Sequence, residues 1–98
     1  MHYNHNRPLS DFQESIDILK AAGYKPIAVS QIYFEDTFIF ETDEEAEKAY
    51  NKFEHTDCDI FGWWYGKDTF LQQVKKYEEE AHNDVKVLVH WLDNTQPL

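Results

Sequence analysis

The stretch of sequence that decides the fold is residues 38–53, which read FIFETDEEAEKAYNKF. The three apolar residues at 38–40 predict a short strand, the second arm of a β-hairpin. Thr42 and Glu45 then form a Thr-x-x-Glu capping box, which marks the start of a helix. The predicted buried stripe of this helix has helical spacing and consists of Ala46, Ala49, Tyr50 and Phe53. The stretch therefore predicts a strand that runs directly into an amphipathic helix.

A first helix is predicted upstream, after a lead-in segment of residues 1–9. Ser10 and Gln13 form a second capping box, so this helix is expected to open at Ser10. Gly23 provides a left-handed cap at its C-terminus, and Pro26 prevents the helix from continuing. The apolar face of the predicted helix is formed by Phe12, Ile16 and Leu19.

The first arm of the hairpin is predicted between this helix and residue 38. Its apolar residues are Ile27 and Val29 on one strand face and Ile32 and Phe34 on the other. Either both faces are buried, or a β-bulge near residues 30–31 brings the four side chains together. We favour the bulge, and we expect the hairpin turn at residues 35–37.

The second half of the chain predicts a strand, a helix and a last strand. In residues 58–65 the apolar side chains alternate between two faces, which indicates a strand or an extended loop. A helix is expected to begin at Gly66 or Lys67, and its core face is formed by Phe70, Val74, Tyr77 and Ala81. The apolar run at residues 85–92 predicts a long strand in the centre of the sheet, followed by a polar tail at residues 93–98.

These elements follow one another in the order α-β-β-α-β-α-β. We therefore expect an α+β fold in which residues 1–98 form a single small domain. A hairpin combined with crossover units is most simply accommodated by one twisted sheet of three or four strands with helices packed on it.

The second half of the chain also carries a family resemblance. Residues 61–70 read FGWWYGKDTF, and they are followed by a helical segment at 74–80 and an apolar segment at 87–92. This aromatic strand, helix and strand resemble the C-terminal half of small phage-encoded early proteins of unassigned function. The resemblance assigns no functional residue, but it implies a host-directed accessory protein rather than a metabolic enzyme.

Composition excludes several classes of function. The chain has 19 acidic and 9 basic residues, a formal net charge of −10 and a pI near 4.7, so nucleic-acid phosphates would repel it. Cys58 is the single cysteine, which excludes an intramolecular disulfide and suits a reducing compartment. The sequence shows neither a signal peptide nor an apolar run of membrane-spanning length. We therefore predict a cytoplasmic protein that does not contact a membrane.

The sequence gives only weak signals for a catalytic site or a metal site. His55 and Cys58 have a spacing found in zinc sites, but the other histidines are scattered, so we predict no metal ion and no cofactor. Asp57 and Asp59 flank Cys58, and their charges would raise the pKa of its thiol and disfavour a nucleophilic thiolate. The two aspartates are themselves more typical of a solvated loop than of an acid–base pair. We predict no catalytic residue and no enzymatic activity.

Two groups of acidic residues are not explained by helix stability. One group lies where the third helix is expected to end, at the end the helix dipole disfavours, and comprises Glu78, Glu79 and Glu80. The other crowds the connection after the second helix and comprises Glu54, Asp57 and Asp59. These acids either keep the protein soluble or form a face in which carboxylates substitute for phosphates, as in a DNA mimic.

The acidic face and the aromatic residues Trp63, Trp64 and Tyr65 together suggest a protein–protein interaction. We predict a non-enzymatic binding protein that inhibits or modulates a basic partner, such as a nucleic-acid-binding or defence protein of a host. Electrostatic attraction would speed association, and an exposed ring would anchor the complex. Adjacent residues of a strand point to opposite faces, so we expect one of Trp63 and Trp64 to be buried and the other accessible.

An alternative is a protein that binds or sequesters a small ligand such as a nucleotide. A base would stack on one of the rings at residues 63–65, and a lysine would bind its phosphate. The available lysines are Lys67, Lys75 and Lys76.

Overall fold

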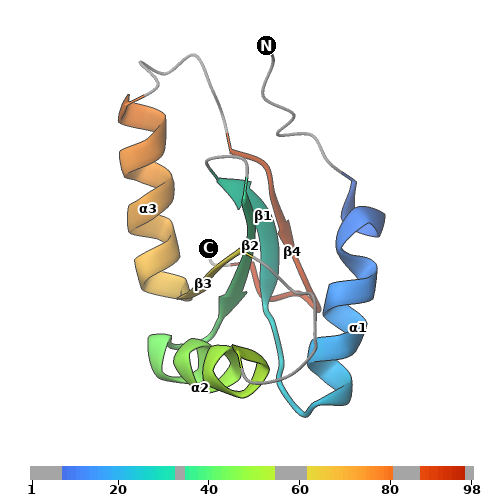
Figure 1. Cartoon of the computed structure of the whole chain (residues 1–98). Coiled ribbons are helices and arrows are strands. Elements are labelled where there is room, and N and C mark those ends of the chain that lie inside the picture. The colour runs from blue at the N-terminus through green and yellow to red at the C-terminus, as the bar shows by residue number, and fades with distance from the viewer. Residues whose placement is uncertain (1–7, 33–34, 55–61, 81–86, 97–98) are drawn as a thin grey trace.

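The computed structural model describes residues 8–32, 35–54, 62–80 and 87–96 (Figure 1). Its elements are η1 (Leu9–Phe12), α1 (Gln13–Ala21), β1 (Ala28–Ile32), β2 (Glu35–Phe40), α2 (Asp43–Glu54), β3 (Trp63–Gly66), α3 (Lys67–Glu80) and β4 (Val89–Trp91). The strands form one four-stranded sheet. The predicted α+β class and the predicted order of elements are therefore confirmed.

The strand order of the sheet is β3-β2-β1-β4. β1 pairs antiparallel with β2 and with β4, whereas β2 and β3 run parallel and are joined through α2. The last strand was predicted to be central, and this prediction is wrong. The hairpin leaves β1 only one side for β4, so β4 lies at an edge of the sheet, with its three residues half-buried.

The hairpin is regular, so the predicted bulge is also wrong. Its register runs without interruption from Ala28↔Ile39 to Ile32↔Glu35. No bulge is needed because helices cover both sides of the sheet, and apolar residues are therefore buried on both faces of β1. Residues 35–37, predicted as the turn, belong to β2, and Phe34 lies outside the described residues.

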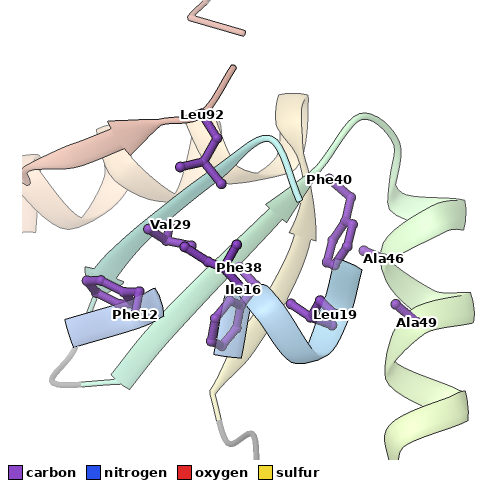
Figure 2. Packing of buried hydrophobic residues seen from close by; sticks show 9 residues of the cluster. All are labelled: Phe12, Ile16, Leu19, Val29, Phe38, Phe40, Ala46, Ala49 and Leu92. Carbon is purple, nitrogen blue, oxygen red and sulfur yellow. The ribbon is translucent and has the colours of Figure 1, made fainter. Parts of the chain in front are cut away.

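Three layers make up the fold, with the sheet between α1 and α3 and with α2 across one end (Figure 1). One core cluster joins a sheet face to α1 and α2 and contains Phe12, Ile16, Leu19, Val29, Phe38, Phe40, Ala46, Ala49 and Leu92 (Figure 2). The other joins the opposite face to α3 and contains Ile27, Ala28, Ile32, Ile39, Phe70 and Tyr77. Consecutive strand residues contribute to opposite clusters, as the alternation of a strand requires.

The first helix differs from its prediction at its start and agrees at its end. A 3₁₀ turn at Leu9–Phe12 precedes α1, and no side-chain hydrogen bond caps either segment, so the predicted capping box at Ser10 does not form. At the C-terminus, Gly23 has a φ of 93° and donates its N–H to the Lys20 carbonyl at 3.0 Å. The predicted left-handed cap at Gly23 is thus confirmed.

The N-terminal cap of α2 is formed as predicted by Thr42. The backbone N–H of Glu45 donates to Thr42 Oγ1 at 3.1 Å. The reciprocal bond of a capping box is absent, because the buried Glu45 Oε2 has no hydrogen-bond partner within the described part of the chain. Ala46 and Ala49 are buried as predicted, but Tyr50 is 45% exposed and does not belong to the buried stripe.

The segment predicted as a polar tail makes specific contacts where the structure describes it. Asp93 and Asn94 have φ values of 52° and 60°, and the N–H of Thr95 donates to the Leu92 carbonyl at 3.0 Å, which closes a tight turn. The Thr95 hydroxyl also donates to the Ile27 carbonyl, and Lys20 Nζ lies 3.6 Å from Asp93 Oδ2. These contacts hold residues 93–95 against the start of β1 and the end of α1.

Candidate functional site

β3 is held at both ends by glycines in positions that exclude a side chain. Gly62 has a φ of 142°, and a Cβ there would lie 1.9 Å from the Asp36 carbonyl oxygen. A Cβ on Gly66 would lie 2.2 Å from the backbone nitrogen of Asp43. β3 can therefore approach β2 and the start of α2 this closely only because both positions are glycine.

The Asp43 carboxylate joins the start of α2 to the junction of β3 and α3. Its Oδ1 accepts the N–H of Gly66 at 2.7 Å, and its Oδ2 accepts the hydroxyl of Thr69 at 2.6 Å. Nearby, Lys67 Nζ lies 3.4 Å from Glu41 Oε1. Asp43 thus fixes the position of α2 relative to β3, in addition to placing a negative charge in the first turn of α2, where the helix dipole favours it.

Replacing Asp43 with alanine should lower the free energy of unfolding by about 1–3 kcal/mol, since a partly buried N–H and a hydroxyl lose a charged acceptor. The double variant Asp43→Ala/Thr69→Val measures the coupling between the two side chains, which we expect to be at least about 0.5 kcal/mol. Urea denaturation of the four proteins of this cycle checks the prediction. Strictly additive effects would show that the contact to Thr69 contributes nothing.

Trp63 and Trp64 lie on opposite faces of β3, as expected, but neither is fully buried. Trp64 packs among aromatic rings, with centroid distances of 5.6 Å to Phe38, 5.9 Å to Phe40 and 5.9 Å to Tyr50. A further contact of 6.0 Å joins it to Phe53. Trp63 is 44% exposed, so it is the accessible ring of the pair.

A groove lies between α2 and β3. Its volume is about 480 Å³, and it is open to solvent. The described residues that line it are Asp43, Ala46, Glu47 and Tyr50 from α2, and Gly62, Trp63, Trp64 and Tyr65 from β3 and the residue before it. The groove therefore combines two exposed aromatic side chains, Tyr50 and Trp63, with two carboxylates.

All charged side chains among the described lining residues are acidic. Both carboxylate oxygens of Asp43 accept hydrogen bonds, whereas the side chain of Glu47 is exposed and makes no hydrogen bond or ion pair with another described residue. Burial raises the pKa of the Tyr65 phenol, so this group stays neutral at physiological pH. The groove is thus suited to a positively charged group rather than to an anion.

The lysines proposed for nucleotide binding are not among the described residues that line this groove. Lys67 pairs with Glu41, and neither Lys75 nor Lys76 appears among the described lining residues. A phosphate bound beside the rings would face Asp43 and Glu47 instead of a cation. This arrangement disfavours the nucleotide alternative.

Of the predicted acidic residues, the structure describes Glu78, Glu79 and Glu80, and it does not bring them together with the aromatic residues of β3. Glu78, Glu79 and Glu80 are near the end of α3, about 18 Å along the helix axis from its start beside β3. Glu78 has a structural contact there, because its Oε2 accepts the N–H of Val87 at 2.9 Å. Asp57, Asp59 and the side chain of Glu54 lie outside the described residues.

Sequence reasoning missed Tyr50 and Glu47 as members of the site. Tyr50 was assigned to the buried stripe of α2, although it follows Ala49 directly and therefore sits at the margin of that stripe. Glu47 has no distinctive signal, since acidic residues are frequent along this helix. Only the packing of β3 against α2 shows that these two side chains face the same groove as Trp63.

The described residues contain neither a candidate metal site nor a helix that could span a membrane. Within the parts that the structure describes, there is no group of three or more His, Cys, Asp or Glu side chains suited to a metal ion. His55 and Cys58 lie outside those parts. The helices described are all too short or too polar to cross a membrane. No family model, curated protein or solved structure matches the chain.

Proposed function

We propose that this protein is a small acidic binding protein, without enzymatic activity, that holds a basic region of a partner protein in the groove between α2 and β3. The observation that carries the proposal is the composition of this groove: exposed Tyr50 and Trp63 beside the carboxylates of Asp43 and Glu47. Aromatic rings and carboxylates are the groups that bind arginine and lysine side chains, through cation–π contacts and ion pairs.

The two kinds of group contribute to different steps of binding. The net charge of −10 attracts a basic surface over a distance and raises the association rate at low ionic strength. Trp63 and Tyr50 supply apolar area that a partner covers on binding, which lengthens the lifetime of the complex. This division follows from the high charge of the whole chain and the local position of the rings.

The partner we propose is a nucleic-acid-binding protein of a host cell, which the protein inhibits or modulates in the cytoplasm. Such partners carry basic surfaces that normally contact phosphates, and a strongly acidic domain competes for them. A phage origin and a role against host defence are supported by the family resemblance of residues 61–92 alone.

The first experiment is to identify proteins that co-purify with the tagged full-length chain from its native host, at low and at moderate salt. With a partner in hand, Glu47→Lys should slow its association by about tenfold at low ionic strength, since the change reverses a charge inside the groove. Stopped-flow or surface-based kinetics over a range of salt concentrations measures this effect.

Glu79→Lys is the matched control, because it changes the net charge by the same amount at an exposed site near the far end of α3. It should slow association by less than about threefold. Equal effects of the two variants would show that only the total charge matters and that the groove is not the binding site. A larger effect of Glu79→Lys would place the site at the end of α3, where the sequence predicts one part of the acidic face.

A further inference from the structure

The strand that lines the groove is an edge strand. Among the described strands, β3 pairs with β2 alone, in parallel register from Thr37↔Trp63 to Phe40↔Gly66. In a parallel pair, alternate residues direct their N–H and C=O groups away from the neighbouring strand. The outer side of β3 therefore presents backbone donors and acceptors that no described strand uses, although the N–H of Gly66 already donates to Asp43 Oδ1, so an added strand pairs with the part of β3 before Gly66.

The groove runs along this unpaired edge. Side chains at successive positions of β3 alternate between the two sides of the sheet, with Trp64 packed against one core cluster and Tyr65 against the other. Nevertheless, four consecutive residues, 62–65, all line the same groove. One face of a strand cannot supply four consecutive residues, so this wall of the groove is the backbone edge itself.

The edge lacks several of the features that prevent strand pairing. Edge strands are often protected by lysine, by proline, by a bulge, by their short length or by a covering helix, and the first three are absent from β3. β3 reads Trp-Trp-Tyr-Gly, and its register with β2 is continuous. Its short length restricts a new pairing to a short segment, and α2 flanks that segment on the other side of the groove.

We propose that the partner binds by strand addition: an extended basic segment pairs with the outer edge of β3 and lies in the groove against α2. Backbone hydrogen bonds to β3 hold the segment, its basic side chains face Glu47, and its apolar side chains cover Trp63 and Tyr50. This inference rests on the proposed function, because it concerns the same groove and the same class of partner.

The charge of the chain favours a basic partner over a second copy of the protein. Two copies joined through β3 would bring two domains of charge −10 together, with Glu47 and Asp43 of each beside the shared edge. Like charges at such a junction repel, whereas a basic segment neutralises them. The occupant is therefore a segment of another protein.

The experiment starts with a library of short random peptides selected for binding to the full-length chain. The tightest peptide is then synthesised in two N-methylated forms, one blocking its odd-numbered amides and the other its even-numbered amides. An added strand directs only one of these two sets toward β3. We expect methylation of that set to weaken binding by at least about tenfold and methylation of the other set by less than about threefold.

Two further measurements separate this inference from the proposed function. Binding of the unmodified peptide to the Glu47→Lys and Glu79→Lys variants tests the groove, and hydrogen exchange of the backbone amides of β3 tests the pairing. Weakening by Glu47→Lys alone, with added protection of β3 amides, supports both proposals. Tolerance of both methylated peptides, with continued sensitivity to Glu47→Lys, overturns strand addition and leaves the proposed function intact.

The remaining outcomes are equally decisive. If the selected peptides are not basic, or bind equally well to the Glu47→Lys variant, both proposals are wrong. If the free chain dimerises in sedimentation experiments and its β3 amides are already protected, a second copy occupies the edge, and strand addition by a partner is overturned.

Discussion

Replacing Gly62 with alanine is expected to destabilise the domain by about 3 kcal/mol or more, which is a large part of the stability of a small protein. A Cβ at this position would lie 1.9 Å from the Asp36 carbonyl oxygen, and the φ of 142° is one that L-residues rarely adopt. The obstacle is backbone rather than a flexible side chain, so β3 must move away from β2. Urea denaturation followed by tryptophan fluorescence measures the change.

Gly23→Ala is the matched control for this prediction. Gly23 also has a positive φ, of 93°, but a Cβ there would have no atom within 4 Å. Its replacement should therefore lower stability by only about 1–2 kcal/mol, through backbone strain without a collision. If Gly62→Ala is no more damaging than Gly23→Ala, the close approach of β3 to Asp36 does not exist in solution.

Replacing Trp64 with alanine should lower the free energy of unfolding by about 3–5 kcal/mol, the range for removing a large aromatic side chain from a core. Trp64 lies within 6.0 Å, centroid to centroid, of the rings of Phe38, Phe40, Tyr50 and Phe53, so its loss leaves a cavity between α2 and the sheet. Thermal and urea denaturation both report this loss.

Trp63→Ala tests the adjacent position, which has the opposite role. Trp63 is 44% exposed, and we expect its replacement to change stability by less than about 1 kcal/mol. The same variant should weaken binding of the partner or of a selected peptide by about tenfold, because exposed aromatic anchors carry much of the binding energy. Equal losses of stability in the two variants would contradict the assignment of Trp64 to the core and Trp63 to the groove.

Local signals in the sequence predicted the elements well. Thr42 caps α2, Gly23 ends the first helix, and α3 begins at Lys67, and each depends on residues a few positions apart. The class and the order of elements follow from such signals together with hydrophobic periodicity. Because these features are encoded by residues close together in the sequence, they can be predicted without knowledge of the three-dimensional contacts.

Apart from the capping box at Ser10, where a 3₁₀ turn forms instead, the errors concern features that depend on distant residues. β4 is as apolar as a central strand, but its edge position is set by the hairpin, which occupies one side of β1. The regular β1 needs no bulge because α3, from a later part of the chain, covers its second face. The groove also depends on distant residues, because Tyr50 and Trp63 line it together only through the packing of α2 on β3.

The pairing of β1 with β4 has a consequence for how the chain folds during synthesis. Ala28 pairs with Trp91, and the Thr95 hydroxyl contacts the Ile27 carbonyl, so β1 is completed by residues near the C-terminus. The β1–β2 hairpin can form early because its contacts are local, but joining β4 requires closure of a long loop. On the ribosome, one edge of β1 therefore stays open until residues 89–95 have left the exit tunnel, so the sheet is completed about 50 residues of synthesis after the hairpin.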